Sequence, residues 1–321
     1  MNEKPLVSIS CLVYNHAPYI RQCLECFVQQ KTTFPFEVLI HDDASNDGTV
    51  EIIKEYEKEY PEIIKPIYQK ENQYSKGVDI STNTMNLPRA QGKYLAFCEG
   101  DDYWTDPNKL QEQVDFLESH PDYAISHTSF QYFNQIKGAF SPDQSVDSNL
   151  KILKESPKDI ASFILDKNKY RIQTATAMYR IDLLKQFLND FSFSGYFLMG
   201  DTQTWVLLSS VGKIHFISKP TAVYRISPNS ICGRGQKSQK TFRFQLSCAE
   251  LRIHFLKYVK SKELQKTFIK DFAKSLITYA SFDPQFHSKL DESIIPQNDA
   301  ILLHLTRKFA PIQKIVQRFW V

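Results

Sequence analysis

Two clusters of carboxylates stand out among the residues whose types could do chemistry. The first lies in HDDASNDGT at residues 41–49, and the second lies in CEGDDYWTDP at residues 98–107. Each follows a short apolar run that is typical of a buried strand, Phe36 to Ile40 for the first cluster and Tyr94 to Cys98 for the second. Ligands of open α/β sheets bind outside the carboxyl ends of the strands. We therefore expect both clusters to face one crevice.

Carboxylates that converge on one crevice repel one another strongly unless a cation neutralises them. Oxygen ligands are those preferred by hard ions such as Mg²⁺ and Mn²⁺, which characteristically bridge to phosphate groups of a substrate. The two clusters therefore predict a Mn²⁺ or Mg²⁺ cofactor and a phosphorylated substrate.

Other interpretations of these acids stay open. The first cluster could form an Asx-turn that caps the following helix, and the second could be a surface turn. Residues 43–48 also match the start of a calcium loop, but Lys54 stands at the twelfth position, where such a loop needs a bidentate Glu. A calcium site is therefore disfavoured.

The elements that must position these acids alternate between strand and helix patterns. Strands are predicted at Leu6 to Val13, Phe36 to Ile40, Ile63 to Tyr68 and Tyr94 to Cys98, and helices from near Pro18, at Thr49 to Tyr60 and at Pro107 to His120. This alternation indicates an α/β fold with a mostly parallel sheet flanked by helices.

The regular alternation of predicted strands and helices ends after about residue 120. Strand-like segments at Tyr123 to Phe133 and Ile172 to Tyr179, helices at Pro157 to Leu165 and Thr202 to Val211, and a strand pair around Lys213 to Ile226 are predicted. From about Lys240 the chain is helical and basic. The loop SPNSICGRGQKSQ places a boundary near residue 230. We expect a catalytic domain at residues 1–230 and a helical C-terminal region at residues 231–321.

Three segments together carry a family resemblance. VSISCLVYNHAPYIRQCL, FEVLIHDDASNDGT and GKYLAFCEGDDYWTDPNKL occur in this order and resemble the large inverting nucleotide-sugar glycosyltransferase family 2, which has the GT-A fold. The resemblance is close over about the first 125 residues and continues weakly to about residue 230. It implies a nucleotide-binding half at about residues 1–125 and an acceptor half at about residues 126–230.

The resemblance also implies roles for residues of the nucleotide-binding half. Tyr14 and Asn15 would line the nucleotide pocket, and Asp43 would accept a hydrogen bond from the base.

Glu99, Asp101 and Asp102 correspond to the acidic D-x-D region of the family. Glu99 and Asp101 would contact the donor, and Asp101 and Asp102 would hold the metal. Glu99 stands where the family commonly has Asp, which leaves open which of the three carboxylates ligates the ion.

The acceptor half contributes three further candidates by the same resemblance. Inverting transfer needs a general base, and Asp201 in YFLMGDTQTW stands at the start of a later helix, where the family has this acid. Asp201 could equally cap that helix. Trp205, one turn on, either packs in the core or stacks on the acceptor. Arg225 in AVYRISPNS would contact the diphosphate, although the family's His two residues beyond it is Ser227 here.

Composition sets the remaining limits. The 321 residues are 42% hydrophobic and 23% charged, as in ordinary globular proteins, and the net charge of +3 is too small to make nucleic acid the main partner. The six cysteines form no dense disulfide framework, so reduced thiols are expected. The first residues lack a secretion-signal pattern and no stretch is apolar enough to span a bilayer, so a cytoplasmic location is expected.

The basic C-terminal third leaves two interpretations open. Segments such as LRIHFLKYVK and LTRKFAPIQKIVQRFWV mix large apolar residues with Lys and Arg at helical spacing. Such helices either contact the inner face of a membrane peripherally or cap the catalytic domain with a solvated basic face.

The sequence therefore predicts a metal-dependent inverting glycosyltransferase. It would move one sugar from a nucleoside-diphosphate donor, most simply UDP-linked, to a carbohydrate or lipid-linked acceptor in surface polysaccharide or glycolipid synthesis. A nucleotidyltransferase acting on a sugar phosphate and a non-catalytic carbohydrate-binding or scaffold protein on the same fold are the alternatives.

Overall fold

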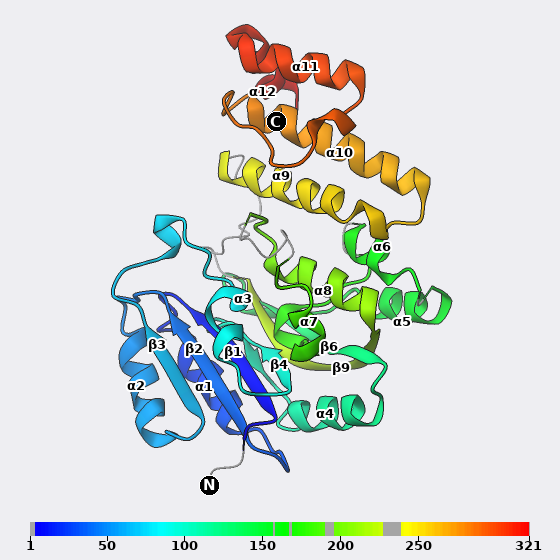
Figure 1. Ribbon diagram of the computed structural model, residues 1–321. Helices are drawn as coiled ribbons and strands as arrows, with labels where there is room; N and C mark the ends of the chain where they lie inside the picture. Colours follow the sequence, from blue (N-terminus) through cyan, green and yellow to red (C-terminus); the bar gives the residue numbers. More distant parts are fainter. Residues whose placement is uncertain (1–3, 157, 167–168, 190–195, 227–238, 321) are drawn as a thin grey trace.

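The computed structural model describes residues 4–156, 158–166, 169–189, 196–226 and 239–320. Figure 1 shows a twisted sheet with helices packed against it, and helices α9 to α12 stacked at the end of the molecule away from the N-terminus. The strands are β1 (Val7–Val13), β2 (Phe36–Asp42), β3 (Ile64–Tyr68), β4 (Tyr94–Phe97), β5 (Tyr103–Trp104), β6 (Tyr123–Asn134), β7 (Ala139–Pro142), β8 (Met178–Arg180) and β9 (Lys213–Ile226).

The helices alternate with the strands in the first part of the chain and follow one another in the last. They are α1 (Ile20–Val28), α2 (Thr49–Glu59), α3 (Thr82–Met85), α4 (Lys109–Ser119), α5 (Val146–Glu155), α6 (Ile160–Leu165), α7 (Ile181–Lys185), α8 (Gly200–Val211), α9 (Gln239–His254), α10 (Lys262–Ala280), α11 (Gln297–Lys308) and α12 (Ala310–Trp320).

The sheet has the order β3-β2-β1-β4-β8-β6-β9-β5, with β7 beside β6. Strands β3, β2, β1 and β4 are parallel, which confirms the prediction for the first part of the chain. Val13 lies opposite Asp42, so β1 and β2 end together and the loops after them emerge at one edge. Beyond β4 the sheet is mixed, because β8 runs antiparallel to both β4 and β6.

Two predicted strand regions have a different structure from the one that the sequence predicts. The predicted strand from Ile172 to Tyr179 begins as a 3-10 turn at Thr174–Thr176, and only β8 pairs in the sheet. Thr176 Oγ1 donates to the carbonyl of Gln173 at 2.7 Å, which favours this turn. The predicted strand pair around Lys213 to Ile226 is the single strand β9, which shifts its register against β6 around Pro220. Pro220 has no N–H to donate to a regular ladder.

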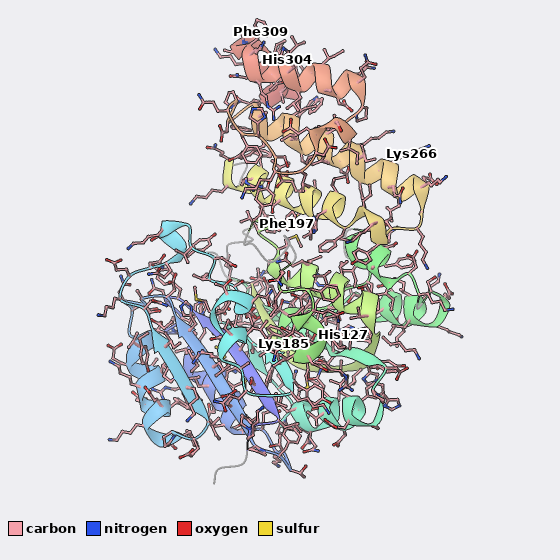
Figure 2. All side chains as sticks on the ribbon, in the orientation of Figure 1. His127, Lys185, Phe197, Lys266, His304 and Phe309 are labelled. Carbon is pink, nitrogen blue, oxygen red and sulfur yellow. The ribbon has the colours of Figure 1, made fainter. Side chains whose placement is uncertain are left out.

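The predicted domain boundary near residue 230 lies outside the described residues. On its C-terminal side, α9 packs against the catalytic part, since Leu251 and Phe255 share a buried apolar cluster with Trp205. The carboxylate of Glu250 is fully buried and accepts hydrogen bonds from Tyr196, Arg243 and Ser288. Figure 2 shows Phe197 between α9 and the helices below it. The C-terminal helices thereby hold the segment that leads into α8.

The described helices include none that combines the length and the apolar character needed to cross a membrane.

A buried polar network holds α4 against the sheet below the second acidic cluster. The side chain of Lys109 is fully buried, donates to Gln113 Oε1 at 2.6 Å and lies 4.5 Å from the centre of the Trp104 ring. Gln113 Nε2 donates to the carbonyls of Ser126 and Thr176. Burial lowers the pKa of Lys109 to about 7, although nearby cysteines oppose the shift.

This network predicts a pH-dependent stability. Between pH 7 and 10 the unfolded chain keeps a proton on Lys109 that the folded chain has released, so the unfolding free energy rises with pH. We expect a contribution of up to about 1.4 kcal/mol per pH unit. Lys109→Met should reduce the slope measured by urea unfolding from pH 6.5 to 8.5, whereas Lys154→Met at an exposed site on α5 should not. Equal slopes for wild type and Lys109→Met would refute this assignment.

Candidate functional site

The loops after β1 and β2 are tied together at the edge of the sheet. The backbone N–H of Asn15 donates to Ser45 Oγ at 2.8 Å, and Asn15 Oδ1 accepts from the N–H of Asn46 at 2.9 Å. Asn15 has a left-handed backbone with φ of 54°, which Asn tolerates better than most residues. Its side chain therefore shapes the loop, while the neighbouring ring of Tyr14 is 44% exposed and free to meet a ligand.

Asp43 is occupied in a way that the sequence did not predict. Its side chain is buried, and its two carboxylate oxygens accept hydrogen bonds from the backbone N–H groups of Gln73 and Tyr74, at 2.7 and 3.1 Å. Asn72 also donates to the Asp43 carbonyl. Asp43 therefore holds the segment around residue 73 against the sheet edge, and its predicted hydrogen bond with a base stays a prediction.

The second acidic cluster forms a tight turn directly after β4. The N–H of Asp102 donates to the carbonyl of Glu99 at 3.0 Å, and the N–H of Gly100 donates to the carbonyl of Leu12, so the turn lies against the end of β1. A Cβ on Gly100 would lie 2.8 Å from the ring of His16. Only glycine permits this close approach, which brings the acids of the turn beside the loop after β1.

Arg225 at the end of β9 secures this turn. Its backbone N–H donates to Asp102 Oδ1 at 2.8 Å, its Nε donates to the Asp101 carbonyl at 2.7 Å, and its guanidinium also bonds Gln22. The guanidinium stacks over the ring of Tyr103 at 4.6 Å. The contact of Arg225 with a diphosphate stays a prediction. The side chain is buried and positions the acidic turn from behind.

The acids of the turn share a strongly negative environment. Burial, together with the charges of Asp101 and Asp201, raises the pKa of Glu99 to about 7. Burial, Asp101 and Glu99 likewise hold the pKa of Asp102 well above its usual range, against the opposing effect of Arg225. The charge of Asp201 acts on Glu99 although the two residues are far apart in sequence, so the fold brings Asp201 into the neighbourhood of the acidic turn.

Asp201 lies in the first turn of α8, where a carboxylate is favoured by the helix dipole. Its Oδ2 accepts from Thr174 Oγ1 at 3.0 Å, and its Oδ1 accepts from the N–H of Thr202 at 2.7 Å. The residue is partly exposed and lines a small cavity of about 80 Å³. Both oxygens are therefore oriented, and the carboxylate remains open to a ligand.

Trp205 packs in the core, which is one of its two predicted roles, and it also lines the small cavity that contains Asp201. Only 2% of the residue is exposed, and its ring packs edge-on against Phe97 and near Tyr179 in the core. Its place one turn beyond Asp201 on the inward side of α8 explains the burial. The residue anchors the helix that carries Asp201.

Several residues that help to build the site carry no signal in the sequence. Thr174 donates a hydrogen bond to Asp201, and Gln22 accepts one from Arg225. The segment around α3 lies beside the start of α8, because a Cβ on Gly200 would lie 3.7 Å from that of Ser81. Thr82 also meets Ser10 of β1 through their hydroxyls at 2.9 Å. These are long-range contacts of ordinary polar residues, which no local motif predicts.

The donor set is compatible with a hard divalent cation. Among the described residues, no three His, Cys, Asp or Glu side chains form a ready-made metal cage. Mg²⁺ and Mn²⁺ do not need one, because they bind through one or two carboxylates together with water and substrate phosphates. A cation at Asp101 and Asp102 would also relieve the repulsion that raises the pKa of Glu99.

Comparison with known proteins places this geometry in a family. A family model described as glycosyl transferase family 2 matches residues 8–188. The uncharacterized protein Rv1520 of Mycobacterium tuberculosis is 46% identical over 120 residues, which are 37% of this chain and 33% of that protein. The chain thus spans about a third of the length of this relative.

Two longer matches cover most of the chain. The putative teichuronic acid biosynthesis glycosyltransferase TuaG of Bacillus subtilis is 29% identical over 263 residues, which are 80% of this chain and 92% of that protein. The structure of S. aureus TarS 1–349 in complex with UDP-GlcNAc has a TM-score of 0.58 and 19% identity, over 98% of this chain and 91% of that one.

The matched residues include the elements that form the candidate site. The family model spans β1, β2, β4 and the acidic turn, the elements on which the site is built. A nucleotidyltransferase finds no support in them. The chain belongs to glycosyl transferase family 2.

Proposed function

We propose that this chain is a metal-dependent inverting glycosyltransferase that moves one sugar from a nucleoside-diphosphate donor, most simply UDP-linked, to a carbohydrate or lipid-linked acceptor. The observation that carries the proposal is the acidic turn after β4, which faces an oriented carboxylate at the start of α8. Structures with similar folds are described with UDP-GlcNAc and, in a mannosyltransferase from Pyrobaculum calidifontis, with GDP-Man and Mn²⁺.

The two acidic elements have separate tasks in such a reaction. Asp101 and Asp102 would hold the cation, which offsets the charge of the departing diphosphate. Asp201 would accept the proton of the attacking hydroxyl from the opposite side of the sugar. Thr174 and the N–H of Thr202 fix the carboxylate, so one lone pair can point at that hydroxyl.

The setting proposed for the reaction is the synthesis of a surface polysaccharide or glycolipid at the inner face of a membrane. The relative TuaG is named for teichuronic acid biosynthesis. A further relative, from Escherichia coli, is named as a glucosyltransferase that uses UDP-Glc and a GlcNAc-diphosphoundecaprenol; it is 32% identical over 145 residues, which are 44% of this chain and 53% of that protein.

A basic apolar surface at the C-terminal end supports a peripheral membrane contact. Ile315 and Phe319 of α12 are 53% and 73% exposed and lie one turn apart, next to Lys314 and Arg318. Figure 2 shows Phe309, which joins α11 to α12, at the same end of the molecule, far from the sheet. An exposed apolar stripe with flanking cations is complementary to an anionic bilayer surface.

The function is tested by incubating the protein with Mn²⁺, a panel of nucleotide sugars and a mixture of oligosaccharide and lipid-linked acceptors, and measuring nucleotide release. Asp201→Asn should lower turnover by about 100-fold or more, because the general base is lost, and should leave donor binding unchanged. Thr174→Val, which removes only one orienting bond, should lower turnover less. No release with any donor, or full turnover by Asp201→Asn, would contradict the proposal.

The metal role of the acidic turn predicts a change in donor binding. Asp101→Ala should abolish most of the Mn²⁺-dependent rise in melting temperature that UDP causes, because the cation loses a ligand. Asp115→Ala, the same change at an exposed carboxylate on α4, is the control. If Asp101→Ala responds to Mn²⁺ and UDP as the wild type does, the metal does not bind at this turn.

The membrane contact predicts selective binding to charged vesicles. Full-length protein should co-sediment with vesicles that contain phosphatidylglycerol and much less with pure phosphatidylcholine vesicles. The double variant Ile315→Ser and Phe319→Ser should lose most of this binding, whereas Ile136→Ser, which changes an exposed residue of a distant turn, should retain it. Equal binding by the double variant and the wild type would exclude α12 as the contact.

A further inference from the structure

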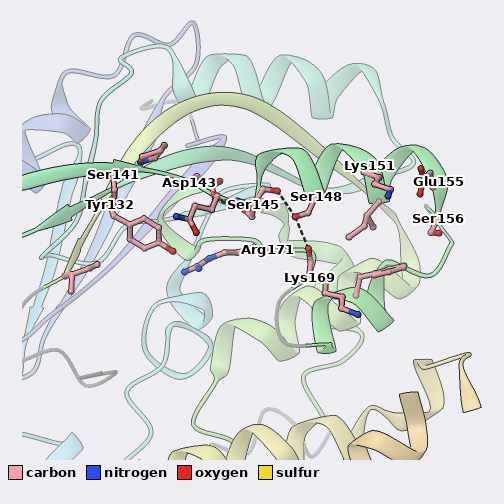
Figure 3. A pocket seen from close by; sticks show the side chains of 15 residues that line it. Tyr132, Ser141, Asp143, Ser145, Ser148, Lys151, Glu155, Ser156, Lys169 and Arg171 are labelled. Carbon is pink, nitrogen blue, oxygen red and sulfur yellow. Dashed lines mark hydrogen bonds between the residues drawn. The ribbon is translucent and has the colours of Figure 1, made fainter. Parts of the chain in front are cut away.

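A cavity of about 780 Å³ lies in the second half of the catalytic part, apart from the acidic turn. It opens to solvent and is lined by residues of β6, β7, α5, α6 and β9 and by the segment around Arg171; Figure 3 shows the lining side chains. Its volume falls within the range of sites for small molecules, about 300–1,000 Å³. No element of the predicted nucleotide-binding half contributes to its wall.

The wall combines an aromatic face with many hydrogen-bonding groups. The ring of Tyr132 lies beside the guanidinium of Arg171, whose centre is 5.5 Å from the ring centre. The remaining polar lining consists of hydroxyl, amide and charged groups from Ser141, Asp143, Gln144, Ser145, Ser148, Lys151, Glu155, Ser156 and Lys169. A flat ring with hydroxyl and amide partners around it suits a sugar, which has apolar faces and a polar rim.

Two residues of the cavity wall border the candidate active site. Arg171 lines this cavity and also the small cavity that contains Asp201. Its guanidinium donates to Gln173 Oε1 at 3.1 Å, and the next residue, Thr174, donates to Asp201. At the other end Ile226 lines the cavity and directly follows Arg225, which holds the acidic turn.

We propose that this cavity binds the acceptor glycan, with Tyr132 as the platform for one sugar ring and Arg171 at the end nearest Asp201. The inference rests on the proposed function, because a bound glycan is an acceptor only if the protein transfers a sugar to it. Binding of the glycan can be measured without turnover. A glycan held here would place its terminal sugar at the wall that Arg171 shares with the cavity of Asp201. The residues of the cavity would then select the acceptor, separately from the residues that bind the donor.

The chain offers a matched control on the same strand. Tyr132 and Phe133 are neighbours in β6, so their side chains point to opposite faces of the sheet. Phe133 packs against Phe140 of β7 and does not line the cavity. Tyr132→Ala and Phe133→Ala each remove one partly buried ring, and only the first removes it from the cavity.

The test measures binding of the full-length protein to an array of defined bacterial surface oligosaccharides, in the presence of UDP and Mn²⁺. We expect the wild type to bind a subset of them, Tyr132→Ala and Arg171→Ala to bind the same subset at least tenfold more weakly, and Phe133→Ala to bind like the wild type. No bound oligosaccharide, or equal binding by all four proteins, would overturn the proposal.

The rise in melting temperature with UDP and Mn²⁺, measured for each protein, separates the two proposals. A rise retained in Tyr132→Ala and Arg171→Ala shows that these variants are folded and still bind the donor, so that their loss of glycan binding arises in the cavity. A wild type with no such rise would count against the proposed function, while glycan binding that depends on Tyr132 would still support the cavity. A normal rise without glycan binding would refute the cavity alone.

Discussion

The arrangement of this site depends on holding like charges together. Glu99, Asp101 and Asp102 occupy one tight turn, and Asp201 adds a further charge that acts on Glu99. Left to themselves these groups would separate or take up protons. Arg225 prevents the first outcome, because it binds both the Asp101 carbonyl and Asp102 from the buried side. On the proposed function, the remaining repulsion would favour the uptake of a cation and of the diphosphate that accompanies it.

The position of Asp201 depends on parts of the chain that lie far from the acidic turn. Trp205 and Phe97 pack α8 onto the sheet, and Thr174 orients the carboxylate from the strand side. The C-terminal helices contribute as well, because the N–H of Leu198 donates to Ser247 of α9 just before α8 begins. A helical region that looks like an appendage in the sequence therefore helps to set the geometry of the candidate base.

The sequence predicts elements of both halves of the fold, whereas the pairing of the later strands does not follow from local patterns. These patterns reveal β1 to β4, β6, α6 and α8, but not β7 or α5. The acids that follow β2 and β4 indicate the edge at which we expect ligands. The structural roles of Asp43 and Arg225 could not be read in this way, and for Trp205 the sequence left core packing and acceptor stacking open. Each is decided by contacts with distant segments: the backbone at residue 73 for Asp43, the turn after β4 for Arg225, and the core around Phe97 for Trp205. A motif gives the residue type but not its partner.

We infer that the acidic turn and Asp201 enclose one cation and one nucleotide sugar. A crystal structure of the protein with UDP and Mn²⁺, with data collected at the manganese absorption edge, would test this inference. We expect one anomalous peak beside Asp101 and Asp102, in contact with the diphosphate, and a space between that diphosphate and Asp201 large enough for a sugar. Manganese and UDP bound away from the turn, or Asp201 directed away from the nucleotide, would contradict it.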